Sequence, residues 1–168
     1  MYMRTILKMM LFAVMTICMS CGDDDEVKLP DTLEVNYAHI AGTWCLSEWN
    51  GEKMDGDNRY YYITFDRKEK DGKRSYMIYT NLNSAVSQQI PGSFKLTDDE
   101  EYGSVISGTY YYQLDTDDEW EYSYVISNLT QKTMTWTAKK IPEEVKVYTR
   151  CDGVPEKIIN GTRSAVKR

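Results

Sequence analysis

The fold of this chain depends on residues 41–50, AGTWCLSEWN, which we interpret as the first of a long series of strands. Gly42 to Trp49 forms the predicted strand, and the Asn50-Gly51 pair after it is a strong turn signal. Almost everything that follows has the pattern of strands as well. The rest of the chain must therefore close back onto this stretch.

The residues after the turn show the period-two alternation of strands with one apolar face. Tyr61, Ile63 and Phe65 share one side of the second predicted strand. The sequence predicts an all-β fold, an antiparallel up-and-down barrel of about eight strands, with a two-sheet sandwich as the alternative. The predicted strands are residues 42–49, 59–66, 73–80, 93–97, 102–114, 119–129, 132–139 and 144–151.

The pattern is less regular before the first strand, between the third and fourth strands, and at one glycine. Residues 35–40 form a short lead-in with one turn of helix, and residues 81–91 form either a lid-like loop or an edge strand. Gly108 marks a bend or bulge within the fifth strand. After the last strand comes a polar tail that is either disordered or a short helix.

Composition restricts the possible partners. The 168 residues carry a net charge of −6, so we expect no nucleic-acid partner, because phosphate binding needs a basic surface. The chain has 14 Tyr and 4 Trp against 3 Phe, so most of its aromatic rings carry a polar tip. The length fits one domain, and we expect a monomer.

The N-terminus has the pattern of an export signal. Arg4 and Lys8 precede an apolar run over residues 9–19 that is too short to span a bilayer. Ser20-Cys21 resembles the lipobox of bacterial lipoproteins, although Cys18 stands where that family usually has Leu. The resemblance implies cleavage before Cys21 and lipidation of its thiol. An ordinary secretory peptide cut elsewhere is the alternative.

An acidic segment, Gly22 to Glu26, follows Cys21 and has the composition of a solvated tether. It resembles the signal that directs Bacteroidetes lipoproteins to the outer leaflet of the outer membrane. We therefore expect a lipid-anchored protein at the cell surface, with the periplasmic face as second choice. The predicted organisation is a signal peptide (1–20), a tether (21–38), a barrel domain (39–152) and a C-terminal tail (153–168).

Two cysteines remain once Cys18 leaves with the signal peptide and Cys21 carries lipid. In an oxidising compartment the remaining pair, Cys45 and Cys151, predicts a disulfide, with two reduced buried thiols as the alternative. The bridge would close a loop of about 100 residues and stabilise the fold by about 4–5 kcal/mol.

The triplet Gly42-Thr43-Trp44 resembles the Gly-x-Trp motif that opens the first strand of lipocalins and their calycin relatives. In that family the Trp plugs the closed end of the barrel, and a basic residue after the last strand packs across it. The resemblance implies this closing role for Arg150. Because the first and last strands of a barrel are neighbours, Cys45 and Cys151, each the next residue along, are expected within reach of one another.

A closer resemblance is to the lipocalin-like lipoproteins of gut Bacteroidetes, over about Ile40 to Cys151. It is carried by Trp49-Asn50-Gly51, by Ile126 to Thr130 and by Met134-Thr135-Trp136. The Thr-Asp-Tyr motif of classical lipocalins is not evident. The resemblance therefore implies the barrel more directly than ligand transport.

The sequence gives little basis for catalysis. The only histidine, His39, precedes the barrel, so neither a Ser-His-Asp triad nor a His-ligated metal site is expected. We predict no enzyme activity, no catalytic residues, no metal and no cofactor. The acidic runs at residues 98–101 and 115–119 are expected to be solvated turns, with calcium binding as the alternative.

Aromatic residues on the predicted inner face are the candidate ligand-binding residues. Because buried hydroxyls need partners, several inward tyrosines indicate a partly hydrated cavity suited to a small amphipathic or polar-aromatic ligand. The alternative is that the rings simply fill the barrel. The candidates are Tyr61, Tyr76, Tyr110, Tyr112, Tyr122, Tyr124 and Trp136. We expect the ligand at the mouth away from Trp44.

Two other functions remain open. Outward-facing Tyr60, Tyr62 and Tyr111 could form an aromatic platform that stacks on sugar rings, which would indicate a surface protein that binds glycans or protein partners. Inhibition of hydrolases is the other possibility, and it rests on fold analogy and size alone.

Overall fold

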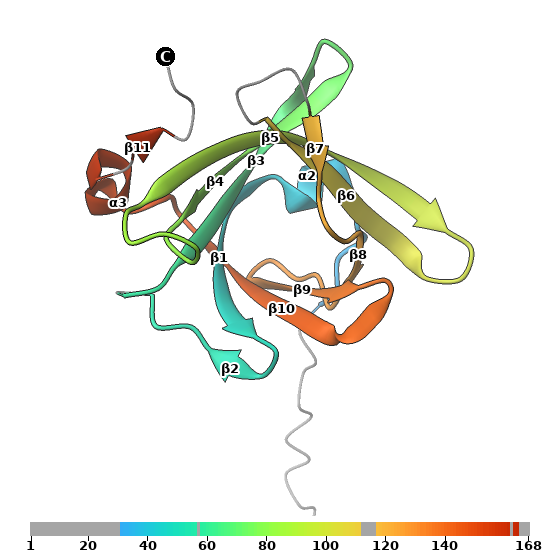
Figure 1. Ribbon diagram of the computed structural model, residues 1–168. Helices are drawn as coiled ribbons and strands as arrows, with labels where there is room; N and C mark the ends of the chain where they lie inside the picture. The colour runs from blue at the N-terminus through green and yellow to red at the C-terminus, as the bar shows by residue number, and fades with distance from the viewer. Residues whose placement is uncertain (1–30, 57, 112–116, 162, 165–168) are drawn as a thin grey trace, which may run out of the picture. The chain divides into compact units, whose positions relative to one another are not determined.

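Eight strands close into a ring in the computed structural model, which describes residues 31–56, 58–111, 117–161 and 163–164 (Figure 1). Each strand of the ring pairs antiparallel with its two neighbours, and the last pairs with the first. The predicted up-and-down barrel is confirmed, and the sandwich alternative is wrong. The predicted signal peptide, Cys21, the tether as far as residue 30 and Tyr112 lie outside the described residues.

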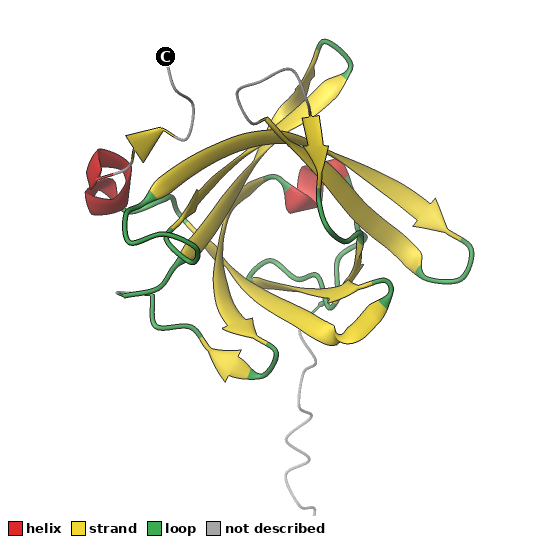
Figure 2. Ribbon diagram, viewed as in Figure 1, coloured by secondary structure: helices red, strands yellow, loops and turns green. Residues whose placement is uncertain are grey.

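The ring follows the order of the chain. Its strands are β1 (Gly42–Trp49), β3 (Tyr61–Lys70), β4 (Lys73–Thr80), β5 (Gln88–Asp99), β6 (Gly103–Tyr111), β8 (Tyr124–Ser127), β9 (Thr133–Ala138) and β10 (Ile141–Cys151). The other described elements are short: α2 (Tyr37–Ile40), β2 (Glu52–Lys53), β7 (Asp117–Glu119), α3 (Glu156–Gly161) and β11 (Arg163–Ser164). Figure 2 shows that strands make up nearly all of the regular structure.

Most strand bounds differ from the prediction by a few residues, and the fourth and sixth predicted strands differ most. The fourth is longer than predicted, because β5 pairs with β4 from Gln88 and with β6 as far as Asp99. Residues 88–91 therefore belong to this strand and not to a lid-like loop. The strand predicted at 119–129 is split into β7 and β8. The tail contains α3, the helical alternative, followed by β11, which pairs with the start of β5.

Gly108 explains why the strand predicted at residues 119–129 is split into β7 and β8. A Cβ atom at this position would lie 2.5 Å from the Trp120 ring, and the Trp120 amide donates to the Gly108 carbonyl at 2.8 Å. Trp120 thus packs flat against the bare backbone of β6. The β5–β6 register continues through Gly108 without a shift, so the predicted bulge is absent.

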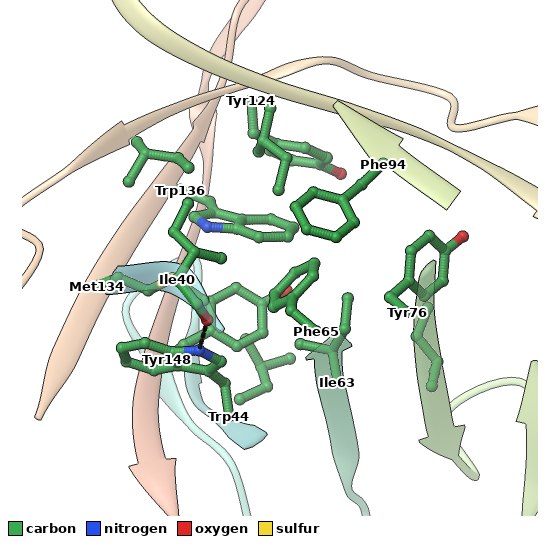
Figure 3. Close-up of a cluster of buried hydrophobic side chains, with 14 of the residues drawn as sticks. Ile40, Trp44, Ile63, Phe65, Tyr76, Phe94, Tyr124, Met134, Trp136 and Tyr148 are labelled. Carbon is green, nitrogen blue, oxygen red and sulfur yellow. Dashed lines mark hydrogen bonds between the residues drawn. The ribbon is translucent and has the colours of Figure 1, made fainter. Parts of the chain in front are cut away.

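Buried side chains close one end of the barrel (Figure 3). Trp44 points inward from β1, is fully buried, and donates its indole N–H to the Ile40 carbonyl at 2.7 Å. Ile40 is the last residue of α2, the one-turn helix expected within residues 35–40. Phe65 and Phe94 belong to the same buried cluster and contact each other with tilted rings, their centroids 4.7 Å apart.

Arg150 lies directly opposite Trp44 in the register of β1 and β10. Its guanidinium carbon is 4.0 Å from the Trp44 ring centroid. The same group donates to three backbone carbonyls, those of Gln131, Ala41 and His39, at 3.0, 2.7 and 2.5 Å. One side chain therefore ties together the first strand, the last strand, the β8–β9 turn and the end of α2.

Gly42 leaves the space that Arg150 occupies. Its φ of +115° is one that residues with a side chain rarely adopt. A Cβ atom there would also lie 2.8 Å from a guanidinium nitrogen of Arg150. Gly42, Trp44 and Arg150 thus lie together at the closed end, which is the arrangement implied by the Gly-x-Trp motif.

Cys45 and Cys151 are free thiols, so the predicted disulfide is absent. The register gives the reason: Cys45 lies opposite Thr149, and Cys151 lies opposite Thr43. A step forward on one antiparallel strand matches a step backward on the other, so the two cysteines are diagonal neighbours. The Cα atoms of such neighbours lie about 7–8 Å apart, whereas those of a disulfide are usually no more than about 6.8 Å apart. Burial and the nearby Cys45 raise the pKa of the Cys151 thiol to about 11, so it stays protonated at neutral pH.

Replacing Arg150 tests this closure. Arg150→Ala should lower the free energy of unfolding by about 2–4 kcal/mol, because it removes charged hydrogen bonds and a desolvated cation–π contact. Thermal unfolding followed by circular dichroism measures the effect. Arg67→Ala, at an exposed arginine on β3, is the matched control and should change stability by less than about 0.5 kcal/mol. Equal effects of the two substitutions would contradict the closing role.

Candidate functional site

A cavity of about 370 Å³ opens at the end of the barrel opposite Trp44. Trp44 and Arg150 lie near the start of β1 and the end of β10, whereas the cavity is lined by the end of β1 and the first half of β10. Its lining residues are Leu46, Trp49, Tyr61, Ile78, Thr80, Leu82, Asn83, Ile90, Tyr110, Trp120, Glu121, Tyr122, Tyr124, Trp136, Glu144, Lys146 and Tyr148.

A bulge in β1 brings Trp49 into the cavity wall. Leu46 pairs with Tyr148, but Glu48 already pairs with Val147, so Ser47 is the extra residue. Strict alternation from Trp44 would place Trp49 on the outside of the barrel. The extra residue reverses the alternation, and Trp49 joins the inner face.

Most of the predicted ligand-binding residues meet at this cavity. Tyr61, Tyr110, Tyr122, Tyr124 and Trp136 all contribute to its lining. They come from four different strands and from the segment before β8, so only the closed barrel brings them together. The sixth described candidate, Tyr76, is placed elsewhere.

Tyr76 is not among the residues that line the cavity. Its ring crosses Gly92, where a Cβ atom would lie 2.2 Å from the phenol. Its hydroxyl donates to the Thr109 carbonyl at 2.9 Å and accepts from the Trp120 indole N–H at 2.7 Å. Tyr76 therefore holds Trp120 in place behind the cavity. Ligand binding by Tyr76 stays a prediction, but its hydroxyl is already engaged on both sides.

Glu144 and Lys146 form a charged pair in the cavity and are absent from the predicted set of ligand-binding residues. The Lys146 ammonium lies 3.2 Å from a Glu144 carboxylate oxygen and donates to the Tyr124 hydroxyl at 2.7 Å. It also lies 4.6 Å from the Tyr124 ring centroid and 5.2 Å from that of Trp49. Both charged side chains are less than a fifth exposed. A cation held between two aromatic faces therefore marks one side of the cavity.

Hydrogen bonds keep Glu144 ionised. Burial alone would raise the pKa of this carboxyl group, but donors on Trp49 and Asn50 and the charge of Lys146 hold the pKa below its ordinary value. The Trp49 indole donates at 2.8 Å and the Asn50 amide at 3.0 Å. Burial lowers the pKa of Lys146, and Glu144 opposes that shift.

Tyr61, which is half-buried, and Tyr148, which is buried, both line the cavity. Tyr148, also absent from the predicted set, is only 1% exposed, and its ring lies 6.3 Å from that of Tyr61. Within the described part of the chain, no hydrogen bond engages either hydroxyl. Burial and neighbouring tyrosines raise the pKa of both phenols well above the ordinary value, so both remain hydrogen-bond donors. The Trp136 indole nitrogen is likewise buried without a hydrogen-bond partner among the described residues.

The outward tyrosines do not form the expected platform. Tyr60 is only 9% exposed, and Tyr62 and Tyr111 are half-buried. The Lys73 ammonium also lies over the Tyr111 ring, 5.6 Å from its centroid. No flat, exposed aromatic surface results from these three residues.

The described residues contain neither a cluster of metal ligands nor a membrane-spanning helix. No three His, Cys, Asp or Glu side chains among them come close enough to hold a metal ion. In the acidic turn at residues 98–101, Asp99 pairs with Lys139. No helix in the same residues is long and apolar enough to span a membrane.

Comparisons with known proteins agree with this architecture. The family model of the lipocalin-like domain matches residues 40–136, which is more than half of the chain. The match runs from the end of α2 into β9, so it includes Trp44 and Trp136 but ends before Lys146 and Arg150. Neither the curated proteins nor the solved structures gave a significant match. The chain belongs to the lipocalin-like domain family.

Proposed function

We propose that this protein binds a small amphipathic molecule with an aromatic or otherwise flat apolar part in the open mouth of its barrel. The observation that carries the proposal is the cavity opposite Trp44, with aromatic walls and a few polar groups on one side. Sites for small molecules have this composition, because apolar walls supply affinity and a few polar groups fix orientation.

The size of the cavity supports a compact ligand. Its volume of about 370 Å³ lies at the lower end of the range for small-molecule sites. Tyr124, Trp136 and Tyr148 form a chain of rings along the wall, with centroids 5.3 and 4.8 Å apart. Such a wall suits a flat ring system better than a long flexible chain.

The proposed role is binding and not catalysis. Glu144 and Lys146 pair with each other, and Glu144 also accepts from neutral donors, while Glu121, the third charged lining residue, is exposed. The described lining residues include no Ser or Cys that Glu144 or Lys146 could activate as a hydrolytic nucleophile. The Cys151 thiol, with its raised pKa, is a poor nucleophile at neutral pH.

We further propose that the protein acts at the cell envelope, anchored through lipid on Cys21 and displayed on the outer membrane. The support is the sequence of residues 1–26 alone. In cells fed radioactive palmitate, the chain should become labelled, and Cys21→Ser should abolish the label. Label that persists in the variant would contradict the anchor. Protease added to intact cells would digest the protein if it lies on the outer surface and would leave it intact if it lies on the periplasmic face.

Filling the cavity tests the binding proposal. The chain is incubated with a mixture of lipids, bile acids and aromatic metabolites, and complexes are detected by native mass spectrometry. Ile90→Trp places a large ring at the mouth and should remove the complexes detected with the unmodified chain. Ile159→Trp makes the same change at a residue that is 45% exposed on α3, and it should leave them intact. Complete failure of the unmodified chain to retain a ligand would contradict the proposal.

A further inference from the structure

We infer that the ligand is an organic anion, a compact ring compound with a carboxylate or sulfonate group, and that its acidic group binds at Lys146. This inference rests on the proposed function, because it assigns a chemical class to the ligand of the same cavity. It is carried by the balance of open donors and occupied acceptors around Lys146, Tyr61 and Tyr148.

The open polar groups of the cavity are donors. An ammonium group has three N–H bonds, and Lys146 uses two of them on Glu144 and Tyr124. Its third N–H remains for a ligand. The hydroxyls of Tyr61 and Tyr148 add two more donors that no described residue engages. A ligand that meets these groups must bring acceptors.

The buried carboxylate of the cavity, Glu144, is already occupied by donors. One oxygen of Glu144 accepts from Trp49 and Lys146, and the other accepts from Asn50. Glu121 is exposed at the rim, where the Tyr122 hydroxyl donates to it at 2.6 Å. At Glu144, a cationic ligand would have to compete with three donors for a buried carboxylate, whereas an anion at Lys146 displaces none of them.

The position of Lys146 sets the orientation of the ligand. Lys146 lies opposite Trp136 in the β9–β10 register, two residues from Tyr148 on the same face of β10. An acidic group at Lys146 therefore leaves the ring of the ligand against Trp136 and Tyr148. Because the ammonium is largely buried, its attraction for an anion is weakly screened by water and salt.

Two fluorescent probes with the same rings test the inference. One is 1-anilinonaphthalene-8-sulfonate, and the other is 1-anilinonaphthalene, which lacks the sulfonate. Each is titrated into the full chain at fixed salt concentration, and the Kd values are compared. We expect the sulfonate to bind about tenfold more tightly or better, which is about 1.4 kcal/mol. The net charge of −6 acts against this preference, so overall attraction cannot produce it.

Variants locate the preference. Lys146→Met keeps the length of the side chain without its charge, and it should weaken binding of the sulfonate about tenfold while leaving the neutral probe unchanged. Lys146→Arg retains the charge and should retain the preference. Lys68→Met removes the charge of an exposed lysine on β3 outside the cavity, and it should have no more than about a twofold effect on either probe. Thermal unfolding of each variant checks the fold.

A second variant covers the case in which Lys146→Met fails to fold. Tyr148→Phe removes only a hydroxyl, and it should weaken the sulfonate severalfold without affecting the neutral probe. The Ile90→Trp variant should reduce binding of both probes, because it fills the cavity that they share.

The outcomes separate the two proposals. If neither probe binds, the proposed function and this inference both fail. If both probes bind in the cavity but the neutral one binds as tightly as the sulfonate, the proposed function stands and the anion is wrong. The inference also fails if the folded Lys146→Met variant keeps the preference of the unmodified chain.

Discussion

The contact between Arg150 and Trp44 is the interaction on which the rest of this structure depends. It joins the last strand to the first, and the three carbonyls that Arg150 binds bring the end of α2 and the β8–β9 turn to the same point. Because Gly42 has no side chain, the guanidinium can lie directly on the indole. One end of the barrel is thereby filled, so a cavity can form only at the other end.

The two strands that close the barrel also build the cavity. Both Arg150 and Lys146 lie on the inner face of β10, one at each end of the barrel. On β1, the bulge at Ser47 changes which residues face inward, so Trp44 fills the closed end while Trp49 reaches the open one. The cavity therefore depends on an irregularity of a single residue in an otherwise regular strand.

Period-two alternation was sufficient to predict the barrel, and the inward rings of Tyr61, Tyr124 and Trp136 followed from it. It could not predict Lys146, because the alternation of charged residues with Val145 and Val147 in that strand favours the valines as the inner face. In the structure the charges face inward, stabilised by Trp49 and the Tyr124 hydroxyl. Side-chain hydrogen bonds and a bulge made these positions favourable, and neither leaves a local pattern in the sequence.

The central claim is that the barrel is filled at Trp44 and open at the mouth. The four tryptophans report on it directly, because each gives one indole N–H signal in a proton–nitrogen NMR spectrum. Single Trp→Phe variants would assign the signals, and 1-anilinonaphthalene-8-sulfonate would then be titrated into the unmodified chain. Our account predicts that the signals of Trp49, Trp120 and Trp136, which line the cavity, shift. The signal of Trp44, whose indole N–H is hydrogen-bonded to the Ile40 carbonyl, should not shift. A shift at Trp44 without shifts at the other three would contradict it.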